Sequence, residues 1–560
     1  MKRDTLVDFF ESVVAQEGVC LVYDDGFRPR SYTYEQLGAA ARRFALRLAE
    51  IGAGRGDRVI LWSENRPAWV AAFWGCLLRG AAVVPVDERH SPDFFERVVR
   101  ITGPKAVLLG DAVHPGRLPE GVPVWRLADL DWRTPAPAVP PAEISAADIA
   151  EILFTSGATA DPKGVVITHR NILANIVPVE REIRRYLHYA KPFHPIRFLD
   201  LLPLSHMFGQ AMAAFIPPIL GGTVVFLRTQ DPREIVRQIR TRRISVMVSV
   251  PRILELLREY IVAVAPEAAA PAPPGERFWR RWWRYRRVHS LFGWKFWSFI
   301  VGGAALDAEL EQFWGNLGFA VIQGYGLTEA APIVTLNHPF HARRGSVGKP
   351  IAGVEIRIAP DGEVLVRGPN ITAGYYNDPE ATAEAFEDGW LHTGDIGELD
   401  AEGRLYIKGR KKEMIVLPDG RNVFPEDVEK VLNAIAGVRE SAVVGVAGAG
   451  GEAVHAVLVL EEGAEAENVV RQANARLEEH QKIRSFTVWP EPELPRTEGT
   501  RKLKRRLIRQ RVAGGGAPAA ARAAEDPVAA ILARYAGSRT LAPDTSLDEL
   551  GLSSLDRIEL

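Results

Sequence analysis

The chain has 560 residues, which is too long for a single hydrophobic core and predicts several domains. Hydrophobic residues make up 47% and charged residues 25%, as in ordinary globular proteins. The formal net charge of −1 argues against nucleic acid as a partner.

The first strand and helix patterns lie near the N-terminus. Arg58–Trp62 and Ala82–Val86 have the apolar pattern of short strands, and Pro67–Arg79 fits a helix with its proline in the first turn. The two cysteines, Cys20 and Cys76, predict buried thiols in a reducing compartment. Because the N-terminus also lacks an apolar signal core, we expect a cytoplasmic protein.

The loop from Phe154 to Val165 (FTSGATADPKGV) is rich in small and hydroxyl residues and ends in a lysine and a second glycine. Backbone N–H groups, hydroxyls and one ammonium can converge on oxyanions in such a loop, which predicts a polyphosphate site. The loop alone leaves open the alternative of a turn without a ligand. Its candidate ligands are Thr155, Ser156, Gly157, Thr159 and Lys163.

An uncharged run extends from Met207 to Leu227. Pairs of prolines and glycines divide this run, so it predicts a short apolar helix, a turn and a buried strand rather than a membrane span. Further along, Ile244–Val250 reads as a strand and Pro251–Tyr260 as a helix, and two more strands lead into glycines near residues 302 and 324. This alternation predicts α/β layers with largely parallel sheets.

The segment Arg277–Trp297 (RFWRRWWRYRRVHSLFGWKFW) combines arginines with aromatic residues. As one helix it would place Phe278, Trp282, Tyr285 and Phe292 near one face, with five arginines on the other. That pattern predicts an interfacial helix attracted to anionic lipid, and hence peripheral membrane contact. The alternative is a helix packed on its own domain with solvated arginines.

Six further segments, with the loop at Phe154–Val165, follow one another in a characteristic order and spacing. They are LPLSHMFG (202–209), VGGAAL (301–306), QGYGLTEA (323–330), WLHTGDIGELDAEGRLYIKGRKKEMI (390–415), GRNVFPEDVE (420–429) and PRTEGTRKLKRRL (495–507). Together they resemble the AMP-forming adenylating superfamily of acyl-CoA synthetases, adenylation domains and luciferases, over roughly Leu6 to Leu507. The 202–209 segment and the arginine-rich segment look most like those of long-chain fatty acyl ligases.

The resemblance implies an α/β fold, with a large N-terminal domain of several parallel-rich subdomains and a small, mobile α+β C-terminal domain. It implies domain ranges of 1–409 and 410–510, followed by a linker at 511–527 and a short carrier-like segment at 528–560. It also implies the substrates ATP, a fatty acid and coenzyme A, with Mg²⁺ bound alongside ATP. The activity would be formation of an acyl-AMP and then of a thioester.

The resemblance also assigns roles to residues. Thr155, Ser156, Thr159 and Lys163 would hold the β- and γ-phosphates, Thr328 would contact the α-phosphate, and Glu329 would bind Mg²⁺. Tyr325 would stack on adenine, beside Gln323, Gly324 and the backbone of Gly303, Ala304 and Ala305. Asp395 and Arg410 would hold the ribose, Lys412 would lie at the hinge and His206 by the acyl pocket. Lys502 is the predicted catalytic lysine, with Lys504 as the second choice.

The chain departs from the family pattern at two places. Ala160 stands where the phosphate loop usually has glycine, and Asp161 adds a negative charge beside it. Near the C-terminus, Arg501 precedes Lys502 where the family has glycine, and one extra residue follows PRT. Loss of catalysis, leaving a lipid- or nucleotide-binding protein, is therefore an alternative.

The last residues, Ser546–Leu560 (SLDELGLSSLDRIEL), resemble the start of an acyl carrier protein. In that resemblance Ser554 would carry phosphopantetheine, and the chain would be an acyl-carrier ligase that loads its own carrier instead of free coenzyme A. A capped surface helix is the other interpretation of these residues.

Overall fold

The computed structural model describes residues 3–24, 28–132, 134–135, 142–155, 162–190, 193–273, 275–338, 343–419, 421–448, 451–496 and 503–514. The chain folds into two compact units. Unit 1 comprises Met1–Ala359, Val364–Thr393 and Glu398–Tyr406. Unit 2 comprises Pro360–Glu363, Gly394–Gly397 and Ile407–Leu560.

The largest sheet of the described chain has nine strands and belongs to unit 1, in the order β15-β14-β13-β12-β11-β9-β10-β1-β2. Its central pairs, from β13 through β12, β11, β9 and β10 to β1, are parallel, and the pairs at both edges are antiparallel. The bounds are β1 (Val19–Asp24), β2 (Pro29–Thr33), β9 (Arg197–Asp200), β10 (Thr223–Phe226), β11 (Val246–Ser249), β12 (Ser298–Val301), β13 (Ala320–Gly326), β14 (Ile333–Leu336) and β15 (Lys349–Pro350).

A second sheet of unit 1 has six strands among the described residues, in the order β6-β5-β3-β4-β7-β8. Only its β7–β8 pair is antiparallel among the pairings that the described residues form. The strands are β3 (Arg58–Ser63), β4 (Ala82–Asp87), β5 (Ala106–Leu109), β6 (Val124–Arg126), β7 (Ile149–Thr155) and β8 (Lys163–Thr168). A third sheet has the order β16-β17-β19-β18, with β20 paired to β19. Its strands are β16 (Glu355–Ile358), β17 (Glu363–Arg367), β18 (Phe386–Glu387), β19 (Trp390–Leu399) and β20 (Leu405–Arg410).

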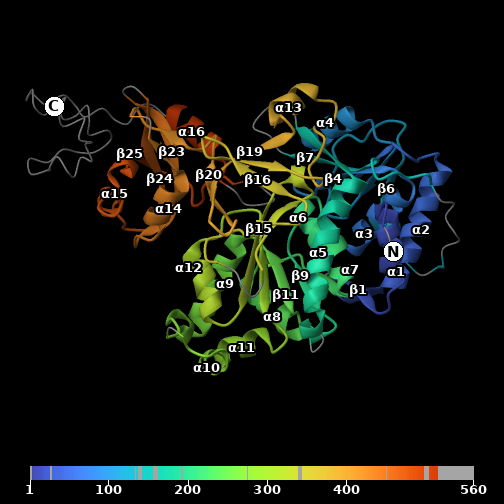
Figure 1. Ribbon diagram of the computed structural model, residues 1–560, viewed down its shortest axis with the longest axis horizontal. Coiled ribbons are helices and arrows are strands. Elements are labelled where there is room, and N and C mark those ends of the chain that lie inside the picture. The colour runs from blue at the N-terminus through green and yellow to red at the C-terminus, as the bar shows by residue number, and fades with distance from the viewer. Residues whose placement is uncertain are drawn as a thin grey trace, which may run out of the picture. The chain divides into compact units, whose positions relative to one another are not determined.

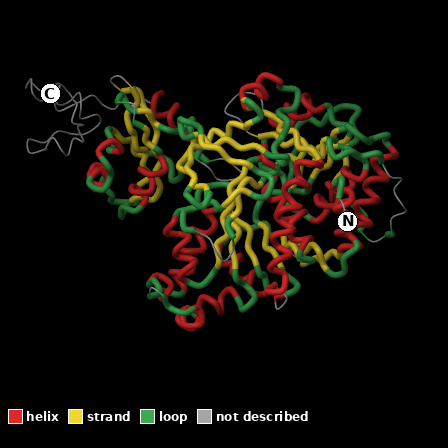
Figure 2. Tube along the Cα trace, viewed as in Figure 1, coloured by secondary structure: helices red, strands yellow, loops and turns green. Residues whose placement is uncertain are grey.

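Helices flank the sheets of unit 1 (Figures 1 and 2). They are α1 (Leu6–Val14), α2 (Tyr34–Glu50), α3 (Pro67–Leu78), α4 (Pro92–Thr102), α5 (His169–Ala190), α6 (Met207–Gln210), α7 (Ile216–Ile219), α8 (Pro232–Thr241), α9 (Pro251–Val264), α10 (Phe278–Arg284), α11 (Arg286–Phe292), α12 (Ala308–Asn316) and α13 (Pro379–Ala385). Shorter helical turns are η1 (Leu127–Asp129), η3 (Ala211–Phe215), η4 (Pro266–Ala269) and η5 (Thr328–Ala330).

Unit 2 has its own apolar core, which α14 and α15 form with strands of its sheet. Strands β23, β24 and β25 lie side by side, and β21 pairs with β22. The elements are β21 (Ile415–Val416), β22 (Asn422–Val423), α14 (Pro425–Asn433), β23 (Val438–Gly448), β24 (Gly451–Leu460), α15 (Ala466–Asn474), η6 (Glu479–Gln481), β25 (Ser485–Val488) and α16 (Arg505–Gly514).

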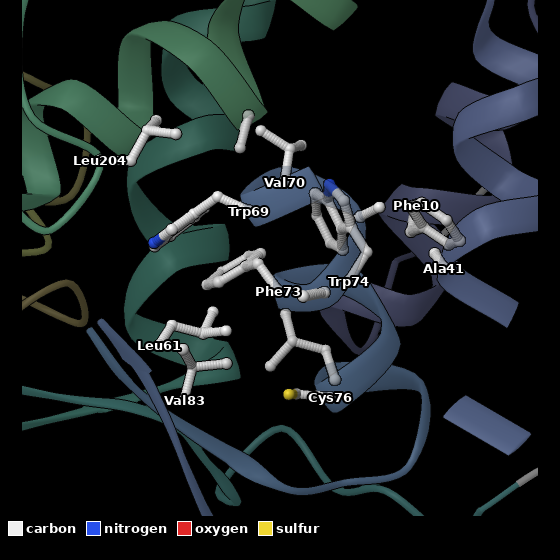
Figure 3. Packing of buried hydrophobic residues seen from close by; sticks show 14 of the residues in the cluster. Phe10, Ala41, Leu61, Trp69, Val70, Phe73, Trp74, Cys76, Val83 and Leu204 are labelled. Atoms are coloured by element: carbon white, nitrogen blue, oxygen red, sulfur yellow. The ribbon is translucent and has the colours of Figure 1, made fainter. Parts of the chain in front are cut away.

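One apolar core of unit 1 is built around α3, whose residues are all buried. Trp69, Phe73 and Trp74 of this helix pack among side chains of α1, α2 and the strands β3 and β4 (Figure 3). Gly75 lets α2 approach closely, because a Cβ there would lie 2.7 Å from the carbonyl oxygen of Ala41. A helix that is apolar all round is expected in such a buried position.

The α/β fold class and the expected strands are confirmed. Arg58–Ser63, Ala82–Asp87 and Val246–Ser249 are strands, and the uncharged run folds into α6, η3, α7 and β10. No helix of the described residues is long and apolar enough to cross a membrane. Cys20 and Cys76 are buried free thiols, as expected, and burial raises the pKa of Cys20 to about 12.

The expected single helix over Arg277–Trp297 is wrong. The segment forms α10 and α11, and the chain leaves helical geometry at Tyr285 and again after Phe292. Tyr285 and Phe292 are fully buried, and the Tyr285 hydroxyl donates a hydrogen bond to the carbonyl of Ala270 at 2.7 Å. Two residues of the expected lipid-facing side, Tyr285 and Phe292, are therefore core side chains, while Trp282 is 44% exposed, because tertiary packing overrides the helical periodicity.

Candidate active site

The turn after β13 presents Thr328 and Glu329, two of the predicted ATP-site residues. Gly326 ends the strand, and a Cβ at this position would lie 2.0 Å from the carbonyl oxygen of Pro332, so the chain folds back too tightly for a side chain. The turn η5 follows at once and leaves Thr328 and Glu329 half-buried. The motif GYGLTE therefore places a hydroxyl and a carboxylate at the end of one strand.

Tyr375 links Glu329 to Lys163. The Tyr375 hydroxyl donates a hydrogen bond to Oε1 of Glu329 at 2.9 Å. The Nζ atom of Lys163 lies over the same tyrosine ring, 5.7 Å from its centroid. Burial and the charge of Glu329 raise the pKa of Tyr375 above its ordinary value, so the phenol stays protonated and remains a donor. One tyrosine thus holds together a carboxylate and an ammonium that are far apart in the sequence.

The segment around Tyr375 is fixed by backbone hydrogen bonds to both sides of this cluster. The Thr372 N–H donates to the carbonyl of Glu329 at 2.8 Å, and the Tyr376 N–H donates to the carbonyl of Gly164 at 2.7 Å. Tyr375 also forms an isolated β-bridge with Val165. The sequence analysis did not predict a role for Tyr375. Its position depends on long-range hydrogen bonds from its own segment to β8 and to η5.

The predicted phosphate loop connects two paired strands. Thr155 ends β7 and Lys163 begins β8, and the two residues are paired in the antiparallel ladder. Ser156, Gly157, Thr159, Ala160 and Asp161 lie outside the described residues. The structure therefore places both ends of the loop beside each other, with the Lys163 ammonium close to the Tyr375–Glu329 pair.

The predicted adenine-binding residues lie at the ends of neighbouring strands. Strands β12 and β13 are parallel, with Val301 opposite Gln323. Gly303, Ala304 and Ala305 follow β12 and are exposed, while Gly324 and Tyr325 of β13 are half-buried. Because ligands of open parallel sheets gather at the carboxyl ends of the strands, these residues share an appropriate edge.

His206 lies next to a buried acid in unit 1. It is the residue before α6, and the preceding Ser205 donates its hydroxyl hydrogen to Oδ2 of Asp87 at 3.0 Å. Burial raises the pKa of Asp87, but the hydrogen bonds and charge of Arg89, together with His206, outweigh this effect and hold it below its ordinary value. Asp87 therefore remains ionised beside His206.

The two predicted ribose ligands contact each other within unit 2. Nε of Arg410 lies 2.9 Å from Oδ1 of Asp395. Asp395 is 4% exposed, whereas the Arg410 side chain is 44% exposed. A buried carboxylate is thus held by a cation that still reaches solvent.

The neighbouring lysines of unit 2 differ in their contacts. Lys411 bridges Asp361 and Glu363 at 2.7 and 2.8 Å, and these carboxylates raise the pKa of Lys411. Lys412, the predicted hinge residue, is exposed. The basic pair therefore contains one residue of an ion-pair network and one solvated cation, which the sequence KGRKKE does not distinguish.

The predicted catalytic Lys502 lies outside the described residues, as does Ser554. Lys504 is described, and its N–H donates to the carbonyl of Pro495 at 2.8 Å, while Arg496 and Leu503 form a β-bridge. Arg505 is held by three glutamates, Glu413, Glu426 and Glu429. Both ends of the segment that carries Lys502 are therefore fixed to unit 2. Residues 511–514, expected to begin a linker, belong to α16.

Comparison with known proteins identifies the family. The AMP-binding enzyme family matches residues 10–376, and the AMP-binding enzyme C-terminal domain matches residues 427–500. The chain belongs to the AMP-binding enzyme family. Among similar proteins is the long-chain-fatty-acid–CoA ligase FadD15 of Mycobacterium bovis, 33% identical over 462 residues, which cover 72% of this chain and 73% of that protein.

Another relative of this AMP-binding enzyme is the feruloyl-CoA synthase of Amycolatopsis sp, 30% identical over 434 residues, covering 74% of this chain and 80% of that protein. A similar solved structure is the O-succinylbenzoate coenzyme A synthetase (MenE) from Bacillus subtilis in complex with ATP and magnesium ion. It has a TM-score of 0.73 and 25% identity, and the match covers 91% of this chain and 99% of that chain. The prediction of an AMP-forming ligase of the acyl-CoA synthetase type is confirmed by these matches.

Proposed function

We propose that this AMP-binding enzyme activates a medium- or long-chain fatty acid and transfers the acyl group to coenzyme A. A carboxylate oxygen of the acid attacks the α-phosphate of ATP, pyrophosphate leaves, and the acyl-AMP is then attacked by a thiol that displaces AMP. The observation that carries the proposal is the cluster of Lys163, Tyr375 and Glu329, which gathers a cation and a carboxylate at one place in unit 1.

In this proposal the cluster acts on the polyphosphate. Lys163, with Thr155, Ser156, Gly157 and Thr159, holds the β- and γ-phosphates, and Thr328 contacts the α-phosphate. Fixed positive charge and N–H dipoles lower the transition-state energy because negative charge grows on the leaving pyrophosphate. Tyr375 positions Glu329 through its hydrogen bond.

The residues present fit a magnesium ion that is shared with the nucleotide. Glu329 accepts one hydrogen bond on Oε1 and keeps lone pairs for a hard cation. The described residues contain no group of three or more histidine, cysteine or acidic side chains that could enclose a metal. Magnesium is usually held by one or two carboxylates with phosphate oxygens and water. When bound, it neutralises phosphate charge.

Unit 2 would contribute the ribose ligands and the catalytic lysine. Asp395 accepts hydrogen bonds from the ribose hydroxyls and Arg410 donates to the same sugar. Lys502 donates to the reacting carboxylate and α-phosphate in the first step, with Lys504 as the second choice. Lys412 would be the hinge residue of a mobile C-terminal domain. We place the domain boundaries at 409, 510 and 527.

The relatives support a carboxylic acid substrate but do not identify which acid it is. Proteins about equally similar to this chain are named as a long-chain-fatty-acid–CoA ligase and as a feruloyl-CoA synthase. We favour the fatty acid because of the LPLSHMFG segment, in which His206 would lie beside the acyl chain. The acceptor would be coenzyme A. An acyl carrier loaded at Ser554 is the second candidate, supported by the sequence SLDELGLSSL near the C-terminus.

Pyrophosphate release tests the substrate. The purified chain is assayed with ATP and Mg²⁺ on saturated acids from octanoic to stearic and on ferulic acid, with and without coenzyme A. We expect release with the fatty acids and thioester formation with coenzyme A. Preference for ferulic acid would overturn the acyl assignment. ATP binding without release for any acid would favour the catalytically impaired homologue.

A paired substitution tests the catalytic lysine. Lys502→Ala should lower acyl-AMP formation by about a hundredfold or more, as for other groups that stabilise transition-state charge. Lys504→Ala should have a small effect if Lys502 is the catalytic lysine, and it keeps the backbone hydrogen bond to Pro495, so the local fold is retained. The reverse result would assign the role to Lys504. Thioester yield on free coenzyme A compared with a full-length carrier decides the acceptor.

A further inference from the structure

Unit 1 contains a pocket of about 370 Å³ whose lining includes none of the candidate active-site residues. It lies where the end of α8 meets α10 and the end of α11, elements that lie together in Figure 1. Gly293 closes α11 with φ of 85°, and its added Cβ would lie 3.7 Å from the Cα of Arg240, so the two helix ends nearly touch. The lining includes Arg240, Arg243, Trp282, His289, Trp294 and Lys295.

The pocket is positively charged without an internal counter-ion. None of its lining residues is acidic. Within the described chain, the guanidinium groups of Arg240 and Arg243 have no carboxylate partner, whereas Arg242, between them, pairs with Asp24 at 2.5 Å. Lys295 is 9% exposed and donates only to the carbonyls of Phe193 and His194 among described residues. An anion would satisfy these cations.

The lysine shows the effect of this uncompensated charge. Burial is the largest effect that lowers the pKa of Lys295, and the positive charges of Arg197 and Arg243 lower it further. His289 adds no charge, because burial lowers its pKa and its Nε2 faces the carbonyl of Leu317 at 2.9 Å. The pocket therefore combines like charges that repel one another until an anion enters.

Two exposed tryptophans, Trp282 and Trp294, line the basic pocket, and Trp283 is next to Trp282 in α10. Trp282 is 44% exposed, Trp283 65% and Trp294 64%, although most large apolar side chains of unit 1 are buried. His289 stacks on Trp282 with ring centroids 5.8 Å apart, and Phe292 is fully buried beneath it. Trp282 is therefore held against the buried part of α11. Tryptophan beside basic residues is the combination favoured at the headgroup level of a membrane.

We propose that this basic-tryptophan pocket binds the phosphate headgroup of an anionic phospholipid and docks the protein on a membrane surface. Arg240, Arg243 and Lys295 surround the phosphate, while Trp282 and Trp294 enter the headgroup layer. A nucleic acid would instead need a basic groove that follows a backbone over many phosphates. The proposal replaces the expected amphipathic helix with a pocket, and it does not depend on which acid is activated.

Vesicle flotation of the full chain tests the proposal. We compare vesicles of phosphatidylcholine alone with vesicles of equal parts phosphatidylcholine and phosphatidylglycerol, at low and physiological salt. We expect binding only to the anionic vesicles. Arg240→Gln and Arg243→Gln should each weaken it about fivefold, since a basic residue near an anionic surface contributes about 1 kcal/mol. Trp294→Ala should also weaken it.

Arg237→Gln is the matched control. Arg237 lies on the same helix as Arg240 and is paired with Glu234 outside the pocket. We expect its vesicle binding to stay near wild type, and pyrophosphate release to be unchanged in all these variants. Equal binding to neutral vesicles, an equal loss in Arg237→Gln, or retention on RNA without vesicle binding would each overturn the proposal.

Discussion

Two groups of acids in the candidate active site are stabilised in different ways. In unit 1, Glu329 accepts a hydrogen bond from a neutral phenol, and no lysine, arginine or histidine of the described chain forms a salt bridge with it. In unit 2, Asp395 pairs with Arg410, and Glu363 pairs with Lys411. Glu329 is therefore held by a neutral donor, whereas Asp395 and Glu363 are each paired with a cation.

This difference suggests different uses. A carboxylate positioned by a neutral donor keeps its negative charge available for a cation that arrives with the nucleotide. A carboxylate paired with arginine presents a nearly neutral surface, which suits hydrogen bonds to uncharged sugar hydroxyls. Under the proposed function, Glu329 would therefore meet a cation, and Asp395 would contact uncharged hydroxyls.

Removing the charge of Glu329 should have the largest effect. Glu329→Gln keeps the shape and the acceptor for Tyr375, so only the charge is lost. We expect acyl-AMP formation to fall by about a hundredfold to a thousandfold, the range for groups that stabilise transition-state charge. Pyrophosphate release at saturating and limiting Mg²⁺ measures this fall in acyl-AMP formation, and Glu309→Gln, at an exposed position, is the control.

Tyr375→Phe separates charge from positioning in the same cluster. It removes one hydrogen bond and leaves the Glu329 charge, so the loss should be only about fivefold, which corresponds to about 1 kcal/mol. If Tyr375→Phe matched Glu329→Gln, the hydrogen bond rather than the charge would be the essential feature. Activity of Glu329→Gln near wild type would contradict the charge role.

Asp395→Asn should give the next largest effect. The change removes the negative charge from a buried site and leaves Arg410 without its partner. If Asp395 holds the ribose equally in ground and transition states, KM for ATP should rise about tenfold to a hundredfold with little change in kcat. Steady-state kinetics measure the change in KM for ATP, and the melting temperature shows whether the variant is still folded. A fall in kcat at constant KM would contradict the positioning role.

Local sequence patterns predicted the elements of this site but not the contacts between them. The strand ends and the turn at Gly326–Glu329 follow from short apolar runs that end in glycine. The Tyr375–Glu329 hydrogen bond joins residues 46 positions apart, and no periodicity reports such a pair. The fold brings Tyr375 into place through hydrogen bonds of its neighbours to Gly164 and Glu329.

The basic aromatic segment shows where periodicity fails. A continuous helix was the natural extrapolation from its sequence pattern, but the chain leaves helical geometry at Tyr285, whose hydroxyl donates to the carbonyl of Ala270. Two of the arginines are also neutralised, Arg284 by Glu276 and Arg287 by Glu267, from the preceding connection. The cations of the basic pocket are Arg240 and Arg243, at and just after the end of α8, and Lys295 near the end of this segment.

Glu151 extends the comparison, because this acid of unit 1 has no lysine, arginine or histidine partner among the described residues, and its neighbour is the neutral amide of Gln210. It is fully buried, and burial raises its pKa from an ordinary 4.5 to about 8. The folded state therefore keeps a proton that the unfolded state loses, so stability falls as pH rises from 4.5 to 8 and then levels.

Glu151→Gln should consequently stabilise the protein at alkaline pH. We expect a gain of about 1–2 kcal/mol above pH 8, where the wild type must ionise a buried group, and almost none at pH 5, because the amide still lacks full hydrogen bonding. Melting temperatures across this pH range measure it, with the exposed Glu50→Gln as the matched control. A gain that is independent of pH would contradict ionisation of Glu151 as the cause.

The smallest expected effect is a change in stability that distinguishes Lys411 from the adjacent Lys412 in unit 2. Lys411→Gln removes the partner of Asp361 and of the 3% exposed Glu363. It should lower the stability of unit 2 by about 1 kcal/mol, because the Lys411 side chain is partly solvated and such ion pairs are weak. Lys412→Gln should leave the melting temperature unchanged, since Lys412 is exposed. If Lys412→Gln lowers thioester formation without changing acyl-AMP formation, the exposed Lys412 acts in the thioester-forming step, while Lys411 supports the fold. Equal melting temperatures for the two variants would show that the ion pairs of Lys411 contribute nothing measurable.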